Sequence, residues 1–233
     1  FNPYYGGGNE EYYMNLIADA MEPYLAASGI QFTRNTPDMT AASSIAASNA
    51  GNYDLHLALH SNAVGSGQQS TVRGIDAYYY PASVNGKRFA DIAANNLQLI
   101  YPLPGMVKTV PTTRLGEVAR VRAPGVLIEL GYHDNPLDAD WIRNNINNIA
   151  ENLVLSLTEY FGIPFNMPQP IQVGYVSTEG SNLNIRSRPD IGAPIIGKIP
   201  NGSEIVIYNR LPEWDLAGYG GVMGYVSSRY VAV

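Results

Sequence analysis

The stretch Asp54-Leu-His-Leu-Ala-Leu-His-Ser-Asn-Ala63 has the pattern of a buried strand that runs into a polar loop. Apolar residues dominate its first part and turn residues flank it, so we predict a strand that delivers His60 to the loop. A second run, Gly125-Val-Leu-Ile-Glu-Leu-Gly-Tyr-His-Asp-Asn135, repeats this design and delivers Glu129. Open α/β sheets assemble their sites at the carboxyl ends of strands. We therefore predict that the two strands face one site.

The first 162 residues alternate between helical and strand patterns. The first predicted helix begins at Asn9 and is closed by Gly29, and Pro23 should kink it or end its first half. Further helices are predicted from Thr40 to about Gly51, over 86–101 and over 138–161. Short strands are predicted over 30–34 and 74–81 in addition to the two quoted above, with loops over 1–8 and 64–71. This alternation predicts an α/β fold with a mostly parallel sheet flanked by helices.

The sequence changes character after residue 162. Residues 163–172 are rich in proline and cannot continue a helix, so we interpret them as a linker. Residues 173–233 contain short strand-like pieces separated by Gly, Pro, Asn and Ser turns, with no helical period. We therefore predict three parts: a first domain over 1–162, a linker over 163–172, and a second, small all-β barrel over 173–233.

Composition excludes several classes of function. The net charge of −6 comes from residues 1–165, which hold 9 Lys/Arg against 15 Asp/Glu, and no basic patch suggests nucleic-acid binding. No window approaches eighteen uninterrupted apolar residues, so no membrane span is expected. The chain has no cysteine, so a metal would need His and carboxylate ligands. Phe1 follows no visible leader, and we expect any targeting segment to lie outside this sequence.

The three histidines are His56, His60 and His133. His56 and His60 are four residues apart, which on a strand corresponds to about 13 Å at about 3.3 Å per residue. That separation is too long for one metal ion, so we interpret His56 as a hydrogen-bonded core histidine.

Glu11 lies in the first turn of the first predicted helix, and that turn should stand over the same sheet edge as His60. An imidazole and a carboxylate are suitable ligands for Zn²⁺, and Glu129 would then be a third member that accepts a proton from water. The alternative is that these carboxylates are structural, with Glu10 and Glu11 complementing the helix dipole.

Four motifs resemble those of the zinc-dependent N-acetylmuramoyl-L-alanine amidases and occur in the same order. They are Glu11-Tyr-Tyr-Met-Asn-Leu16; Phe32-Thr-Arg34 with Asp38; Asp54 to Ala63; and Ala123-Pro-Gly-Val-Leu-Ile-Glu-Leu-Gly-Tyr132 with Asn135. The resemblance covers most of residues 9–160. It implies cleavage of the amide bond between N-acetylmuramic acid and the first alanine of the peptidoglycan stem peptide.

The resemblance also implies roles for individual residues. Glu11 and His60 correspond to zinc ligands and Glu129 to the catalytic residue. We expect Asn62, His133 and Asn135 to contact the substrate. The family's first zinc ligand is a His in a Gly-His-Gly-Gly loop, and no His precedes Glu11 here. Either that ligand lies upstream of Phe1 or another residue replaces it, for which His133 is the candidate.

The C-terminal region resembles bacterial Src-homology-3-like (SH3-like) domains, which accompany cell-wall hydrolases and bind peptidoglycan. The matching stretches are Leu183-Asn-Ile-Arg-Ser-Arg-Pro189, Ile196 to Gly202, and Gly224-Tyr-Val-Ser-Ser-Arg-Tyr230. Tyr175, Trp214 and Tyr225 are candidates for stacking on sugar or peptide, or alternatively for filling the core of the barrel.

We therefore expect an extracellular or cell-wall peptidoglycan hydrolase that uses zinc-activated water. Two alternatives remain open: a catalytically silent wall-binding protein with an incomplete metal site, and a zinc peptidase that cleaves stem peptides. The sequence does not distinguish a host autolysin from a spore hydrolase or a phage lysin.

Overall fold

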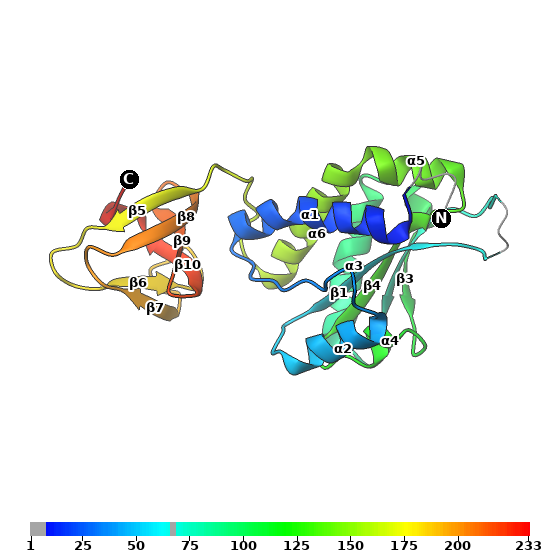
Figure 1. Cartoon of the computed structure of the whole chain (residues 1–233), viewed down its shortest axis with the longest axis horizontal. Helices are drawn as coiled ribbons and strands as arrows, with labels where there is room; N and C mark the ends of the chain where they lie inside the picture. Colours follow the sequence, from blue (N-terminus) through cyan, green and yellow to red (C-terminus); the bar gives the residue numbers. More distant parts are fainter. Residues whose placement is uncertain (1–7, 66–68) are drawn as a thin grey trace. The chain divides into compact units, whose positions relative to one another are not determined.

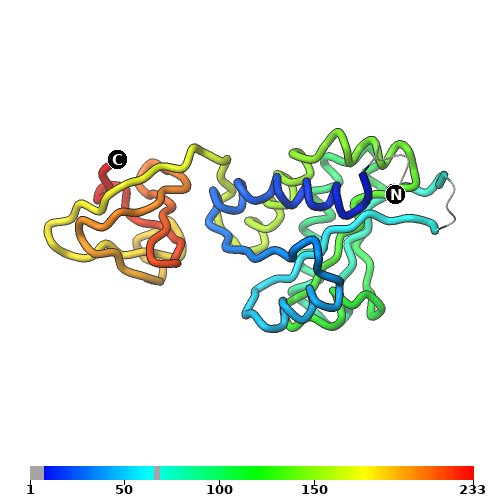
Figure 2. The backbone as a smooth tube through the Cα atoms, viewed as in Figure 1, coloured from blue at the N-terminus to red at the C-terminus, as the bar shows by residue number. Residues whose placement is uncertain are grey.

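The computed structural model describes residues 8–65 and 69–233, and Figures 1 and 2 show the path of the chain. The chain forms two compact units: Phe1–Met21 with Thr33–Phe161, and Glu22–Phe32 with Gly162–Val233. The loop predicted at the start of the chain, as far as residue 7, and residues 66–68 of the second predicted loop lie outside the described residues. In the described part of the chain, no helix combines the length and the apolar character needed to cross a membrane.

The first unit contains a four-stranded sheet in the order β1-β4-β2-β3. Its strands are β1 (His56–Asn62), β2 (Ile75–Tyr79), β3 (Val107–Pro111) and β4 (Gly125–Tyr132). β1 runs parallel to β4 and β2 runs parallel to β3, but β2 is antiparallel to β4. The α/β class is confirmed, whereas the expectation of a mostly parallel sheet is only partly correct, because the central β2–β4 pair reverses direction.

Helices flank this sheet (Figure 1). They are α1 (Glu10–Ser28), α2 (Ala41–Ala50), α3 (Val84–Gln98), α4 (Gly116–Ala119), α5 (Pro136–Asn144) and α6 (Ile146–Phe161), with a short 3₁₀ turn η2 (Pro104–Met106) before β3. α3 packs against β2, β3, β4 and α6. Phe89 and Leu97 of α3 and Ile128 of β4 are fully buried, so one face of the sheet belongs to the apolar core.

α1 runs through Pro23 to Ser28, and Gly29, with φ of +78°, closes it as predicted. Two other predicted elements differ from the structure. Residues 30–34 form no strand, and Arg34 instead bonds back to Asp19 and Asn15 of α1. The single helix predicted over 138–161 is two helices, because Asn145 ends α5 and its side chain donates to Trp141 O at 2.8 Å.

The opposite face of the sheet carries the polar site. The same face also carries a small apolar cluster, in which Val118 of α4 packs against Ala58 of β1 and Leu127 of β4. Side chains alternate along a strand, so residues two positions further on point to the same face. Those residues are His60 and Glu129, which therefore lie next to the apolar cluster.

The second unit is an antiparallel sheet of seven strands in the order β11-β5-β8-β9-β10-β6-β7. The strands are β5 (Gln172–Val176), β6 (Leu183–Arg186), β7 (Ile195–Ile199), β8 (Glu204–Arg210), β9 (Trp214–Tyr219), β10 (Val222–Ser227) and β11 (Val231–Ala232), with a 3₁₀ turn η3 (Ser228–Tyr230) between the last two. Ile185, Ile199, Ile205 and Val226 are in its core. This arrangement confirms the prediction of a separate all-β region.

Candidate active site

One register line of the sheet carries a titratable side chain on each of its four strands. His60 on β1 is the Cα partner of Glu129 on β4, Glu129 is the partner of Asp76 on β2, and Asp76 is the partner of Lys108 on β3. Direct cross-strand partners point to the same face of the sheet, and in an antiparallel pair such as Glu129 and Asp76 their Cβ atoms are about 4.5–5.5 Å apart. The two strands identified in the sequence therefore do meet at one site.

His60 lies between two carboxylates that come from different helices. Its Nδ1 is 2.9 Å from Glu10 Oε1, and its Nε2 is 3.1 Å from Glu117 Oε2. Burial opposes a positive charge on this imidazole, but the two hydrogen-bonded carboxylates outweigh burial and raise the pKa of His60 to about 10. The two carboxylates therefore favour an imidazolium that is held at both nitrogens.

The acid that α1 contributes is Glu10, whereas Glu11 is exposed to solvent. Glu10 Oε1 also accepts a hydrogen bond from the Ser61 backbone N–H at 3.1 Å. Burial raises the pKa of Glu10, but its bonds with His60 and Ser61 are stronger, so the net pKa is lowered. Adjacent residues on a helix point about 100° apart. Only one of the two acids can reach His60, and the sequence motif favoured the other one.

Glu129 is a half-buried carboxylate whose second oxygen has no partner among the described residues. Its Oε2 atom is inaccessible and has no hydrogen bond among the described residues. Burial raises the pKa of Glu129 to about 7; nearby His60 opposes the rise, and Glu10 and Asp76 add to it. A carboxylate with a pKa near 7 can both accept and donate a proton at neutral pH.

Sequence reasoning missed Glu117 and Asp76. Glu117 belongs to the four-residue helix α4, which is too short to show a periodic signal. Its Oε1 is 3.9 Å from the Nε2 of His56, whose Nδ1 is 3.0 Å from Ser48 Oγ. The interpretation of His56 as a hydrogen-bonded core residue therefore agrees with its geometry. Asp76 interrupts an apolar strand, and that interruption was a usable signal.

The three residues expected at the substrate have different surroundings. Ser61 Oγ is 2.9 Å from His133 Nδ1, and the His133 backbone N–H donates to Asn62 O at 2.8 Å, so Asn62 and His133 adjoin His60. Asn135 is only 5% exposed. Its amide donates to Ser70 O at 2.9 Å and its Oδ1 caps α5, so both ends of this side chain are engaged inside the protein.

The donor chemistry of the site suits zinc. Zn²⁺ binds imidazole nitrogen and carboxylate oxygen, and a ligating His usually gives its second N–H to a carboxylate. His60 has a carboxylate at each ring nitrogen, so either one could take the N–H while the other nitrogen faced a metal ion. Within residues 8–65 and 69–233, however, no group of three or more His, Asp or Glu side chains is arranged to hold a metal ion. The described residues therefore do not form a complete metal site, and His60 with its neighbouring carboxylates offers donor atoms of the kind that zinc binds.

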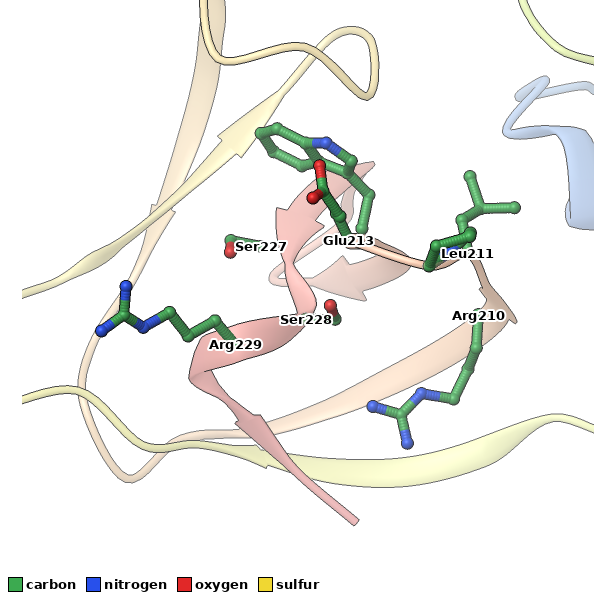
Figure 3. A pocket seen from close by; sticks show the side chains of 8 residues that line it. Arg210, Leu211, Glu213, Ser227, Ser228 and Arg229 are labelled. Carbon is green, nitrogen blue, oxygen red and sulfur yellow. The ribbon is translucent and has the colours of Figure 1, made fainter.

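The second unit has a pocket of its own, of about 580 Å³. Arg210, Glu213 and Arg229 surround it together with Ser227 and Ser228 (Figure 3). The candidate stacking residues differ in exposure: Tyr175 is 50% exposed, whereas Tyr225 is 2% exposed and fills the core. For Tyr225, the alternative of a core position therefore agrees with the structure and the stacking interpretation does not.

Comparison with known proteins gives two family matches. Residues 3–159 match the N-acetylmuramoyl-L-alanine amidase family, and residues 181–232 match the bacterial SH3 domain. No curated protein matches the chain.

Solved amidase structures share the fold of the first unit at low sequence identity. An N-acetylmuramoyl-L-alanine amidase from Clostridium difficile 630 is 18% identical, with a TM-score of 0.59, over 66% of this chain and 85% of that one. The catalytic domain of CwlV from Bacillus (Paenibacillus) polymyxa is 20% identical, with a TM-score of 0.57, over 68% and 88%. Ami1 from Mycobacterium smegmatis is 17% identical, with a TM-score of 0.59, over 67% and 79%. With the family match spanning residues 3–159, the chain belongs to the N-acetylmuramoyl-L-alanine amidase family, and a bacterial SH3 domain follows its amidase domain.

Proposed function

We propose that the chain is a peptidoglycan hydrolase that cleaves the amide bond between N-acetylmuramic acid and L-alanine of the stem peptide. The observation that carries this proposal is the meeting of Glu10, His60 and Glu129, which come from a helix and two neighbouring strands. The family match supports the reaction class. The bacterial SH3 domain supports action at the cell wall, where a wall-binding module would raise the local concentration of the enzyme.

Each residue has a distinct role in this proposal. Zn²⁺, held by His60 and Glu10 with a further ligand, would polarise the scissile carbonyl and lower the pKa of water toward about 7. Glu129 accepts a proton from the attacking water and then passes it to the leaving amide nitrogen. Asn62 and His133, next to His60, are positioned to contact the substrate. We assign Asn135 to holding the loop at Ser70 because its polar atoms are engaged.

The direct test is incubation of zinc-loaded protein with purified sacculi. The proposal predicts the release of new N-terminal alanine, and mass spectrometry should find lactyl ends on the glycan and intact stem peptides. Fragments cut within the stem peptide would instead identify a zinc peptidase. No release of either kind under zinc-replete conditions would overturn the proposal.

One observation favours a second candidate, a catalytically silent wall-binding protein: the described residues supply no complete group of three metal donors. Zinc analysis of the purified chain separates the two candidates. About one zinc ion per chain supports the enzyme, whereas less than one ion per several chains, together with retained binding to sacculi, supports the silent protein.

The neighbouring acids Glu10 and Glu11 provide a matched pair of variants. We expect Glu10→Gln to weaken zinc binding by roughly 10- to 100-fold, because it removes a carboxylate next to His60. Glu11→Gln makes the same charge change one residue away on an exposed side chain, and its zinc affinity should equal that of the unmodified protein. Competition with a chromophoric chelator measures both. If Glu11→Gln weakened zinc binding more than Glu10→Gln did, Glu11 rather than Glu10 would be the ligand.

Asp76 should influence the pH profile of the reaction. The Asp76 carboxylate helps to raise the pKa of Glu129, so Asp76→Asn should lower that pKa and move the acid limb of kcat/KM to lower pH. The limb moves in this direction because Glu129 must be deprotonated to accept a proton. Asp91→Asn, on the far helix α3, makes the same change of charge and should leave the limb in place. An unmoved limb in Asp76→Asn would contradict the expectation.

A further inference from the structure

Glu117 lies between two histidines, and its side chain is largely shielded from solvent. Its side chain is 14% exposed, with Oε2 at 3.1 Å from His60 Nε2 and Oε1 at 3.9 Å from His56 Nε2. The short helix α4 that carries it is fixed in the apolar cluster through Val118. This carboxylate therefore has a defined place beside the site, although no sequence motif identifies it.

The two sides of the His60 ring differ in access to solvent. On the Nε2 side, Glu117 and His56 are 14% and 12% exposed. On the Nδ1 side, Glu10 is 36% exposed. A ligand arriving from solvent therefore reaches Nδ1 more readily than Nε2.

A neutral imidazole carries one N–H and one lone pair, and a hydrogen bond to one nitrogen decides which nitrogen keeps the proton. An ionised carboxylate only accepts hydrogen bonds, so Glu117 favours a proton on Nε2 of His60 and Glu10 favours one on Nδ1. A cation that reaches His60 from solvent displaces the proton on the more accessible Nδ1, and Glu117 then keeps the proton on Nε2.

We propose that Glu117 is a positioning residue that holds His60 through Nε2–H and so directs Nδ1, together with Glu10, toward the metal ion. This inference rests on the proposed function insofar as His60 is taken as a zinc ligand. Glu117 does not touch the substrate in this arrangement. It orients the ligand and fixes its tautomer, a role that carboxylates commonly have behind zinc-binding histidines.

Zinc affinity tests this role without any enzymatic assay. With competition by a chromophoric chelator on the full chain, Glu117→Ala should bind Zn²⁺ roughly 10- to 100-fold more weakly. Glu117→Gln should lose less, roughly several-fold, because an amide oxygen can still accept from Nε2–H but is uncharged. Glu179→Ala removes one negative charge from an exposed turn of the second unit and should bind as the unmodified protein does.

Imidazole nitrogen NMR provides the second readout. The chain has only three histidines, so a His60→Ala spectrum identifies the His60 signals. In the zinc-loaded protein we expect His60 to carry a proton on Nε2 and the metal on Nδ1. Glu117→Gln should keep this pattern, and Glu117→Ala should lose the preference. A merely structural residue would change the unfolding midpoint without changing the nitrogen that binds zinc.

The outcomes separate this inference from the proposed function. Unchanged zinc affinity in both Glu117 variants, or zinc on Nε2 in the unmodified protein, would overturn the role of Glu117 even if sacculi release alanine. If Glu117→Ala fails to fold, the Glu117→Gln affinity and spectrum decide the question. The expected affinity losses without any alanine release would leave the role of Glu117 intact and reject the amidase proposal.

Discussion

Replacing Glu129 by glutamine should lower the rate of alanine release by at least about 100-fold, because an amide cannot take a proton from water. Glu129 is suited to proton transfer by its position beside His60 and Asp76, its buried Oε2 and its pKa of about 7. Glutamine has nearly the same shape, so the register of β4 should be unchanged. Initial rates on zinc-loaded protein and a soluble muropeptide measure the effect.

The same substitution should not reduce stability. The folded-state pKa of Glu129 is raised to about 7, so between its unfolded value near 4.5 and about 7 the folded chain binds more protons than the unfolded chain. Stability associated with this group is therefore present at low pH and is lost as the pH rises through about 7. At pH 8 a neutral glutamine avoids the cost of a buried charge, and we expect an unfolding midpoint at least as high as that of the unmodified protein.

A loss of activity without a loss of stability would identify a reacting group. Glu151→Gln on α6, remote from the strands of the site, is the control and should retain full activity. Residual activity of Glu129→Gln within a few-fold of the unmodified protein would exclude Glu129 as the proton-transfer residue. A variant that also loses zinc would instead show that Glu129 helps to hold the metal.

The sequence was sufficient to predict the strands that carry His60 and Glu129, because each is an apolar run with one titratable residue near its end. The sequence was not sufficient to predict which strands of the sheet run parallel and which antiparallel. The antiparallel pairing of β2 with β4 depends on contacts between distant segments, which the alternation of helices and strands does not specify. Likewise, the apolar period continues across Asn145 although the helix breaks there.

Within the site, the sequence did not determine which residue of α1 faces His60. The motif Glu-x-x-x-Asn-Leu selected Glu11, but the orientation of α1 directs Glu10 to His60. A change of one residue in phase rotates a side chain by about 100°, and only tertiary contacts fix that rotation. Glu117 could not have been found in this way, because α4 spans a single turn and its role arises from proximity to His56 and His60.

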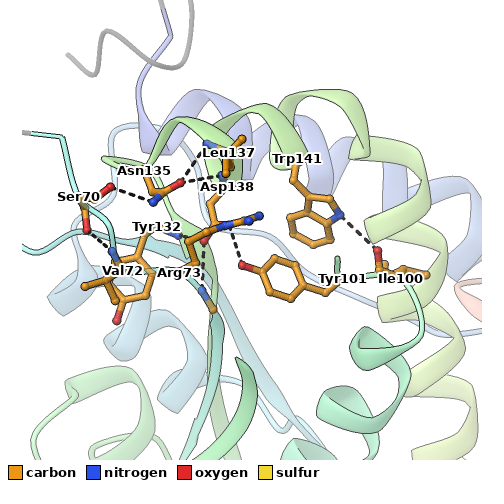
Figure 4. Close-up of polar contacts among 11 residues, drawn as sticks. Ser70, Val72, Arg73, Ile100, Tyr101, Tyr132, Asn135, Leu137, Asp138 and Trp141 are labelled. Atoms are coloured by element: carbon orange, nitrogen blue, oxygen red, sulfur yellow. Dashed lines mark hydrogen bonds and ion pairs between the residues drawn. The ribbon is translucent and has the colours of Figure 1, made fainter. Parts of the chain in front are cut away.

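A second large effect is expected at Asp138, a fully buried carboxylate on α5 (Figure 4). Its Oδ1 accepts from Arg73 Nε and from Tyr101 OH, each at 2.7 Å. Its Oδ2 accepts from the backbone N–H groups of Gly74 at 3.2 Å and Tyr132 at 3.0 Å. One carboxylate therefore joins the start of β2 to the end of β4, the strand that carries Glu129.

The close approach of Asp138 depends on Gly131. This glycine has φ of +98°, and a Cβ at this position would lie 3.3 Å from the Asp138 side chain. The bond network also affects Tyr101, whose pKa is raised above its usual value by burial and by its hydrogen bond to Asp138. Asp138 thus joins the Arg73 guanidinium and two backbone N–H groups in one hydrogen-bond network. Loss of the carboxylate would leave these donors without their acceptor.

Asp138→Ala should destabilise the first unit by about 3–5 kcal/mol, because it leaves the Arg73 charge and two backbone N–H groups without their partner. For a chain of this size the unfolding midpoint should fall by roughly 10 °C. The chain has two tryptophans, Trp141 and Trp214. In a Trp214→Phe background, fluorescence reports Trp141, which is 6% exposed and packs against Tyr101 at 4.9 Å between ring centroids, so it follows the first unit alone.

Asp140→Ala is the matched control, two residues further along the same helix. Asp140 is 52% exposed and pairs with Arg143 at i+3, and such surface pairs contribute about 0–1 kcal/mol. Its midpoint should therefore change by no more than roughly 3 °C. Equal shifts in the two variants would mean that helix propensity, rather than the buried carboxylate, determines the stability at α5. A large shift for Asp138→Ala alone would show that the strand end behind Glu129 is held in place by this one side chain.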